Sequence, residues 1–271
     1  MRRNEIHEVK VSINEFTGGT ALELARLDLC REERAGIPEV ILGAGKRPRD
    51  VIRLIKTLAM KKGLAMATKA GRPCVQMASR ENHDELRFED YPRAQVIVAR
   101  KKDHPFPDPQ GLVGIFAAGT ADVGVAEEAR ITLQVLGCKA LVAYDVGVAG
   151  IHRLYEPLQE MKAKRVQVII VVAGMEGALA SVVKGLVPVP VIGVPTSVGY
   201  GHGGGGQAAL MCMLQSCSPG LVVVNIDNGF GAAAAAALMA RGGWESVREA
   251  GTTFKGGKTH EKDNNPSWSS P

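Results

Sequence analysis

Aromatic residues are scarce in this chain: they make up 4% of its 271 residues, whereas hydrophobic residues make up 45%. The core is therefore expected to consist of aliphatic side chains. Long hydrophobic runs are also missing, since none approaches the ~20 residues that a membrane-spanning helix needs. The first eight residues, Met1-Arg-Arg-Asn-Glu-Ile-His-Glu8, are polar, and no apolar signal region follows them. We therefore expect a cytoplasmic protein.

Paired cysteine motifs are absent as well. The five cysteines show neither C-x-x-C spacing nor the Cys/His spacing of a zinc site. A disulfide framework is not expected in a cytosolic chain of this length, so most of these thiols are predicted to be small buried hydrophobes. The turn Gly119-Thr-Ala-Asp122 is not a Walker A motif, because no Gly-Lys-Ser/Thr follows it, and it is not a G-x-G-x-x-G fingerprint either.

Positive charge is concentrated in the first part of the chain. Residues 1–110 carry 21 Lys and Arg against 16 Asp and Glu, a net charge of +5, and residues 111–271 carry 12 of each. Such a region can face a polyanion, or the phosphates of a ligand across a cleft. Most of these side chains are nevertheless expected to be solvated surface, because no nucleic-acid-binding motif accompanies them. We expect small-molecule partners and neither a nucleic acid nor a membrane.

The first part, residues 1–100, is predicted to be a small α+β domain. Its apolar spacing predicts helices over 17–35 and 49–62, strands over 38–42, 64–68, 74–79 and 93–98, and a charged surface segment over 81–91. Residues 101–110 hold three prolines within five positions, and we interpret them as a linker because proline removes backbone donors and disfavours helix.

The second part, residues 111–250, alternates short β-branched runs with helix-like segments. The strands are predicted over 112–117, 139–144, 166–173, 189–194 and 221–226. Five such units predict an α/β fold with a parallel sheet and helices on both faces. Residues 251–271 are polar and rich in Gly, Ser and Pro, so they are predicted to form a disordered tail.

Candidate binding residues lie where the predicted strands end, because these loops build the ligand crevice of a parallel sheet. Gly119, Thr120 and Asp122 open a helix whose backbone amides favour phosphate. A carboxylate repels phosphate unless a cation lies between them, so Asp122 is either a ligand residue or a helix cap. After the second strand, Asp145 can bind ribose hydroxyls or a metal. Asp122 and Asp145 are therefore the candidate metal ligands, and His152 and Arg153 begin the next helix near the same crevice.

The next two strand ends add a third carboxylate. Glu176 lies between two glycines, which let a ligand approach the backbone closely, and we favour a functional role over helix capping for it. The Gly-rich segment 199–206 is predicted to be a mobile loop or a spacer. The other binding candidates of these two loops are Gly174, Met175, Gly177, Pro195 and Thr196.

Cys217 lies in a turn between a predicted helix and a buried strand. A thiolate there can act as a nucleophile if its pKa is lowered. An inert thiol is the commoner situation, however, and a helix-to-strand loop usually lies at the edge of the sheet opposite the crevice. From the residues alone, Cys217 is catalytic only if the preceding helix carries it across or another subunit completes the site.

Several segments closely resemble the LarB family. They are Gly119-Thr-Ala-Asp-Val-Gly-Val-Ala-Glu-Glu-Ala129, Asp145-Val-Gly-Val-Ala-Gly-Ile-His-Arg-Leu154, Gly174-Met-Glu-Gly-Ala-Leu-Ala-Ser-Val-Val-Lys184, Pro190-Val-Ile-Gly-Val-Pro-Thr-Ser197 and Asn225-Ile-Asp-Asn-Gly-Phe-Gly-Ala232. Residues 27–40, with Gly45 and Lys46, are similar to the N-terminal domain of that family. The C-terminal domain of LarB proteins is similar to the aminoimidazole ribonucleotide carboxylase/mutase (PurE-type) family. The resemblance therefore implies a flavodoxin-like parallel sheet and a homo-octamer.

The resemblance also implies an activity, that of pyridinium-3,5-biscarboxylic acid mononucleotide synthase, a carboxylase and hydrolase of nickel-pincer nucleotide cofactor biosynthesis. The implied substrates are nicotinic acid adenine dinucleotide, CO2 or bicarbonate, and water; AMP is released, and Mg2+ is the implied ion. The family's nucleophilic cysteine matches Cys217 and its essential glutamate matches Glu176. Thiolate addition at C4 of the pyridinium ring makes C5 nucleophilic toward CO2, and Glu176 is the hypothesised base for the C5 proton. Contacts to phosphate, ribose or Mg2+ are expected from Thr120, Asp122, Asp145 and His152.

Two other functions remain open. Ile151-His152-Arg153 is similar to an Ala-His-Arg segment of the aminoimidazole ribonucleotide carboxylases and mutases, in which the histidine transfers a proton. The extra N-terminal domain, the Gly-Met-Glu-Gly turn and Cys217 argue against that function. The third candidate is a nucleotide-binding regulator that keeps an enzyme-like scaffold without catalysis.

Overall fold

The structure is a computed structural model that describes residues 20–22, 25–81 and 83–251. The first part of the chain forms β1 (Thr20–Leu22), β2 (Ala25–Leu27), α1 (Arg31–Ala35), β3 (Ile41–Leu42), α2 (Pro48–Lys62), β4 (Leu64–Thr68), α3 (Arg72–Ala78), β5 (Leu86–Tyr91) and β6 (Val96–Lys101). The second part forms β7 (Leu112–Ala117), α4 (Val123–Val135), β8 (Lys139–Ala143), α5 (His152–Ala163), β9 (Val168–Ala173), α6 (Leu179–Leu186), β10 (Val191–Pro195), α7 (Gln207–Leu214), β11 (Leu221–Val223) and α8 (Gly229–Gly251). Three short 3-10 helices also lie in the second part: η2 (Thr120–Asp122), η3 (Val148–Gly150) and η4 (Gly201–Gly203).

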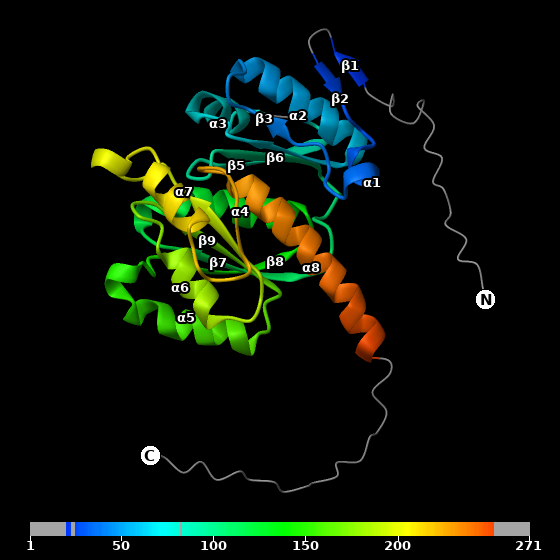
Figure 1. Ribbon diagram of the computed structural model, residues 1–271. Helices are drawn as coiled ribbons and strands as arrows, with labels where there is room; N and C mark the ends of the chain where they lie inside the picture. The colour runs from blue at the N-terminus through cyan, green and yellow to red at the C-terminus, as the bar shows by residue number, and fades with distance from the viewer. Residues whose placement is uncertain (1–19, 23–24, 82, 252–271) are drawn as a thin grey trace, which may run out of the picture.

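These elements stack in layers. Helices α2 and α3 cover the outer face of a four-stranded sheet, whose strand order is β3-β4-β6-β5 (Figure 1). Helices α4 and α8 lie between that sheet and a five-stranded sheet. Helices α5, α6 and α7 pack on the far face of the five-stranded sheet. The first part of the chain thus rests on α4 and α8, which also cover one face of the larger sheet.

The five-stranded sheet is parallel throughout, in the order β8-β7-β9-β10-β11. Counted from β7 along the chain, this is the order 2-1-3-4-5 of flavodoxin-like folds. The predicted α/β class with helices on both faces is therefore confirmed. The strand order reverses between β7 and β9, so the ligand crevice is expected above the carboxyl ends of these strands.

The core of the larger sheet is aliphatic, as the scarcity of aromatics predicts. Every residue of β9 is buried, because helices cover both of its faces. The small alanine side chains of α8 allow this helix to pack closely against α4. The backbone of Gly229, the first residue of α8, approaches α4 more closely still. A Cβ at Gly229 would lie 2.9 Å from the carboxylate Oε2 of Glu128 on α4. This close approach fixes the turn after β11 against α4.

Two predicted elements of the first part are wrong. The helix predicted over 17–35 is replaced, where the structure describes it, by β1, β2 and the short α1. Along β2, Arg26 is exposed and Leu27 is buried. This change from one residue to the next is expected in a strand, because successive side chains point to opposite faces. The strand predicted over 74–79 is helix α3, which has a proline in its first turn and buries Cys74, Val75 and Ala78 at helical spacing.

The charged segment 81–91 contains one more strand than predicted. Strand β5 lies at the edge of the four-stranded sheet and pairs antiparallel with β6. Charged side chains are common on edge strands because they discourage pairing with other chains.

The boundaries at 100, 110 and 250 stay predictions, and residues 1–19 and 252–271, with most of the predicted tail, lie outside the described residues. In the described part, none of the helices combines the length and apolar character that a bilayer crossing requires.

Candidate active site

Asp122 connects the loops after β7 and β10. Its Oδ2 accepts a hydrogen bond from the backbone N–H of Gly119 at 2.8 Å, and its Oδ1 accepts one from Thr196 Oγ1 at 2.6 Å. Only 4% of Asp122 is exposed, and Thr196 is fully buried. The bond to Gly119 is the capping contact that the sequence offers as one interpretation of Asp122. Both carboxylate oxygens thus face protein donors beneath the crevice.

Burial makes the pH response of Asp122 predictable. Desolvation raises the pKa of this carboxyl above its ordinary value of 3.8, against the hydrogen bonds from Thr196 and Gly119. A raised folded-state pKa contributes stability that is fully present below 3.8 and is lost as pH rises through the folded pKa. In Asp122→Asn the neutral amide does not titrate. The free energy of unfolding of the wild type should therefore fall relative to that of Asp122→Asn as pH rises above 3.8.

Urea unfolding of the wild type and of Asp122→Asn, at several pH values above the ordinary aspartate pKa, measures the difference between their free energies of unfolding. The control is Asp50→Asn, because the hydrogen bond from Arg47 lowers the pKa of Asp50 below its ordinary value of 3.8. The contribution of Asp50 is lost only as pH falls below 3.8, so the difference between wild type and Asp50→Asn should stay flat above that pH. A difference between wild type and Asp122→Asn that stays flat or rises with pH would contradict the effect of burial.

The loop that carries Glu176 rests on the loop after β10. The backbone N–H of Met175 donates to the carbonyl oxygen of Val198 at 2.8 Å. Gly174 lies so close to this loop that a Cβ would lie 2.6 Å from Thr196 Oγ1 and 2.8 Å from the Cβ of Val198. Met175 and Glu176 are both exposed above this contact. The position of Glu176 therefore depends on the segment Thr196–Val198.

Gly174→Ala should lower the free energy of unfolding by about 1–3 kcal/mol, because the added methyl group overpacks a rigid backbone contact. The control is Gly185→Ala within α6, where an added Cβ would meet nothing within 4 Å. Alanine in a helix interior is more favourable than glycine by about 0.5–1 kcal/mol, so the control should be slightly stabilised. Urea unfolding measures both, and equal effects would contradict the close packing at Gly174.

Asp227, in the turn after β11, binds the same loop but is absent from the predicted site. Its backbone N–H donates to the carbonyl oxygen of Pro195 at 2.8 Å, and its Oδ1 accepts from the backbone N–H of Ser197 at 2.8 Å. Asp227 has a positive φ of 56°, which side chains rarely adopt. The turn lies in one of the segments that resemble the LarB family, and this signal could have pointed to Asp227 from the sequence.

A partly buried ion pair joins this turn to the first part of the chain. Lys69, directly after β4, donates from Nζ to Glu128 Oε2 at 2.8 Å and to the carbonyl oxygen of Asp227 at 2.5 Å. Only 1% of Glu128 is exposed; it also accepts hydrogen bonds from the Thr68 hydroxyl and from the backbone N–H of Gly229, the latter at 3.2 Å. Sequence reasoning missed this cluster, because its members lie 59 and 158 positions apart.

Asp145 lies apart from these contacts. It is exposed and accepts a hydrogen bond from the guanidinium of Arg153, while His152 is exposed at the start of α5. Within the described ranges, no group of three or more His, Cys, Asp and Glu side chains could hold a metal ion. Asp122 faces Gly119 and Thr196, and Asp145 pairs with Arg153. The binding of Mg2+ by these two carboxylates stays a prediction.

Cys217 is exposed in the loop between α7 and β11. The neighbouring serines fix this loop against α6: the side chains of Ser181 and Ser216 are hydrogen-bonded at 2.8 Å, and Ser218 Oγ donates to the carbonyl oxygen of Ser181 at 3.2 Å. Ser181 lies in the first turn of α6, which follows the Glu176 loop. The loop precedes β11 (Leu221–Val223), so it lies at the amino end of that strand, at the edge of the sheet opposite the crevice.

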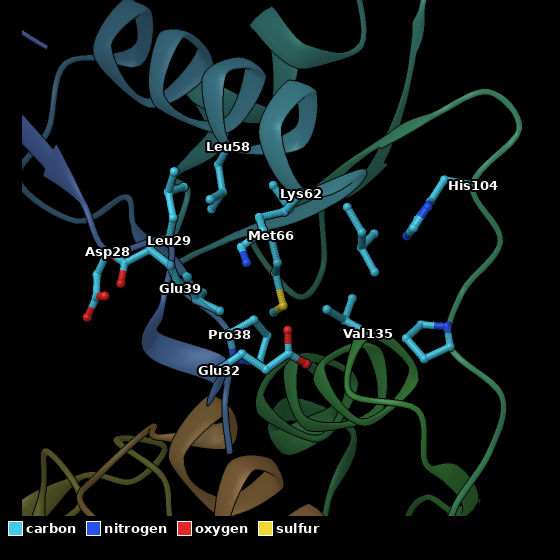
Figure 2. A pocket seen from close by; sticks show the side chains of 14 residues that line it. Asp28, Leu29, Glu32, Pro38, Glu39, Leu58, Lys62, Met66, His104 and Val135 are labelled. Atoms are coloured by element: carbon cyan, nitrogen blue, oxygen red, sulfur yellow. The ribbon is translucent and has the colours of Figure 1, made fainter. Parts of the chain in front are cut away.

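A cavity of about 110 Å3 lies elsewhere, where α2 and β4 approach α4. Figure 2 shows the side chains of Leu58, Met66 and Val135 in its wall, and acidic side chains that include Glu32 along one side. None of the predicted site residues lines it. Sites for drug-sized ligands usually have roughly 300–1,000 Å3, so this cavity is too small for a dinucleotide. The candidate active site stays the crevice expected above the carboxyl ends of the strands.

The comparisons with known proteins agree with this architecture. The profile of the AIR carboxylase family matches residues 112–260, and that of the LarB/PurE-like N-terminal domain matches residues 20–101. An uncharacterized protein of Methanocaldococcus jannaschii is 45% identical over 227 residues, 81% of this chain and 85% of its own length. The chain belongs to the LarB family. As a LarB protein, it has the PurE-like domain at its C-terminal side.

Two relatives with a named activity each match less than half of this LarB protein. The N5-carboxyaminoimidazole ribonucleotide mutase of Pyrococcus horikoshii is 30% identical over 104 residues, 37% of this chain and 53% of its own length. The mutase of the same name from Methanocaldococcus jannaschii is 34% identical over 125 residues, 45% of this chain and 74% of its own length. These matches support a carboxylase-type role for the LarB chain.

Proposed function

We propose that this protein carboxylates C5 of the pyridinium ring of nicotinic acid adenine dinucleotide and hydrolyses the phosphoanhydride. The products are pyridinium-3,5-biscarboxylic acid mononucleotide and AMP, which places the enzyme in nickel-pincer nucleotide cofactor biosynthesis. The observation that carries the proposal is the presence of both family matches in one chain with an exposed thiol at Cys217. Glu176 is exposed too, on the loop after the central strand β9.

The chemistry gives each of these two residues a step. The thiolate of Cys217 adds to C4 of the pyridinium ring, which breaks aromaticity and leaves an enamine whose C5 is nucleophilic. C5 then attacks CO2, and a carbon–carbon bond forms while the ring becomes an iminium. Glu176 takes the C5 proton, and the electron pair expels the thiolate from C4 and restores the ring. Covalent catalysis thereby divides one inaccessible step into several easier ones.

The remaining predicted residues bind and orient the dinucleotide in this proposal. Thr120 is exposed at the start of η2 and offers its hydroxyl to the ligand, and Arg153 and His152 offer a cation and an imidazole at the start of α5. Asp122 and Thr196 act indirectly, because their hydrogen bond holds together the loops after β7 and β10. Water then cleaves the phosphoanhydride, and one phosphate leaves with AMP and the other with the carboxylated mononucleotide.

Mg2+ is part of the proposal only as an ion brought with the diphosphate. Mg2+ commonly keeps several waters and binds one or two carboxylates plus substrate phosphates. Asp145 is the exposed carboxylate near the crevice, although it is paired with Arg153. Bound there, the ion would neutralise phosphate charge. The ring chemistry uses the thiolate, the carboxylate and CO2.

A second subunit would complete the site. Met211 and Leu214 on α7 are each 60% exposed, and Val222 on β11 is 46% exposed. Exposed apolar side chains near one another favour a protein contact, and Cys217 lies in the loop between these two elements. We propose that copies of the chain assemble through this edge into a homo-octamer, and analytical ultracentrifugation of the full chain tests it.

Chromatography combined with mass analysis tests the proposed reaction against its main competitor, because the product of a mutase is an isomer of its substrate and has the same mass. The purified protein is mixed with bicarbonate and the pyridinium dinucleotide, and separately with N5-carboxyaminoimidazole ribonucleotide. Gain of one carboxylate on the ring and release of AMP support the proposal. Conversion of the imidazole ribonucleotide alone would favour the mutase, the function named for two relatives. Binding of the dinucleotide without turnover would favour a regulator.

A further inference from the structure

We infer that Lys69 is a positioning residue of the carboxylation centre, through which the first part of the chain holds the loop that carries Glu176. The inference rests on the proposed function for its catalytic consequence. Its structural basis is the pair of hydrogen bonds from the Lys69 ammonium group to Glu128 and to the carbonyl oxygen of Asp227. Lys69 belongs to neither the parallel sheet nor its helices.

The backbone at Lys69 is rigidly held. Its φ of 50° is in the left-handed region, which a lysine occupies only when the surrounding packing holds it there. Gly43 lies against it, since a Cβ at Gly43 would lie 2.8 Å from the Cα of Ala70 and 3.0 Å from the carbonyl oxygen of Lys69. The backbone N–H of Ala70 donates to the carbonyl oxygen of Gln95 at 2.8 Å. The side chain therefore leaves the small sheet from a fixed point.

The ammonium group of Lys69 is held in place as firmly as its backbone. Glu128 is a buried carboxylate, and a buried charge needs a counter-ion and hydrogen bonds. Lys69 supplies the counter-ion, and the Thr68 hydroxyl and the backbone N–H of Gly229 supply further donors. The same ammonium group binds the carbonyl oxygen of Asp227 at 2.5 Å. Lys69 thus clamps the turn after β11 to α4.

A continuous set of contacts leads from this clamp to the Glu176 loop. The carboxylate of Asp227 accepts the backbone N–H of Ser197 at 2.8 Å. One residue further, the carbonyl oxygen of Val198 accepts the backbone N–H of Met175 at 2.8 Å. Met175 directly precedes Glu176. Loss of the clamp should therefore shift the Glu176 loop, because the contacts that hold that loop are themselves held by Asp227.

The effect on catalysis should appear in kcat. A displacement of about 1 Å can lower a rate roughly 100-fold, so Lys69→Met should lower kcat by about 10- to 100-fold. KM for the dinucleotide should change by less than about threefold, because Lys69 is not expected to touch the substrate. Lys69→Arg keeps the charge and should recover part of kcat.

The control is Lys56→Met. Lys56 forms an ion pair with Glu81 in the first part of the chain, and its side chain is 30% exposed against 32% for Lys69. Lys56→Met removes one positive charge, as Lys69→Met does, but it leaves the contacts of Lys69 with Glu128 and Asp227 in place. The double variant Lys69→Met/Glu128→Gln is measured alongside, because it removes both charges and leaves no unpaired buried carboxylate.

Steady-state kinetics is combined with hydrogen exchange of residues 196–200 and 225–231, which does not depend on activity. Faster exchange there, with lower kcat and unchanged KM in Lys69→Met and the double variant but not in Lys56→Met, supports the inference. Unchanged exchange and kcat would overturn it, and so would a raised KM with unchanged kcat, which would make Lys69 a substrate contact. A wild type that does not carboxylate the dinucleotide removes the proposed function, and the exchange data then decide separately whether Lys69 clamps the loops.

Discussion

Replacement of Cys217 with alanine is expected to lower kcat for carboxylation by about 1,000-fold or more, because without thiolate addition C5 of the pyridinium ring remains electron-poor. Binding of the dinucleotide should persist. Cys217 is exposed, so its replacement should leave the free energy of unfolding nearly unchanged. Turnover is measured by product mass and binding by titration calorimetry.

Cys212→Ala provides the matched control. Cys212 is a free, partly exposed thiol on the neighbouring helix α7, five positions earlier in the chain. It should keep wild-type kcat. If Cys217→Ala carboxylated at a rate near that of the wild type, the covalent mechanism would be wrong, whatever the family relationship.

The second large effect is expected for Glu176→Gln, with kcat lower by about 100- to 10,000-fold, the usual contribution of a general base. The amide has the size of the carboxylate but does not accept the C5 proton. Thiolate addition and attack on CO2 precede that proton transfer. The carboxylated adduct should therefore accumulate on Cys217 in the variant and be visible by intact mass.

Glu160→Gln serves as the control, because Glu160 is an exposed glutamate on α5 that pairs with Lys164 away from the crevice. It should neither slow turnover nor accumulate an adduct. A normal kcat in Glu176→Gln would remove Glu176 from the reaction. A slow variant without an adduct would place Glu176 before carboxylation instead of after it.

The parallel sheet could be predicted from the sequence because its strands are buried on both faces. Strands β7, β9 and β10 are continuous apolar runs bounded by Gly-containing turns, and this pattern has few alternatives. The first part was harder, since the segment 17–35 has enough leucines for a helical pattern, although Leu27 is buried on a strand. In that segment the packing against α2 decides between helix and strand. A pattern of neighbouring residues does not contain that information.

The site was predictable only as a set of loops. Strand-end glycines and carboxylates located the crevice at Gly119, Asp122, Glu176 and Thr196. The hydrogen bond between Asp122 and Thr196 spans 74 positions, and the clamp from Lys69 to Asp227 spans 158. The first pair follows from the order of strands within one sheet, and the second from the packing of the first part of the chain on the second. Neither pair leaves a periodic signal. Cys217 shows the same limit, because only the family resemblance singled it out from the other thiols.

The covalent role of Cys217 is most directly tested by intact-mass analysis of the protein mixed with nicotinic acid adenine dinucleotide and bicarbonate and quenched during turnover. The account predicts a protein species heavier by the mass of the dinucleotide, with or without the added carboxylate, and peptide mapping that places the mass on Cys217. Glu176→Gln should show more of the carboxylated species than the wild type. Accumulation of carboxylated product while the protein stays unmodified, or a modification on another residue, would contradict it.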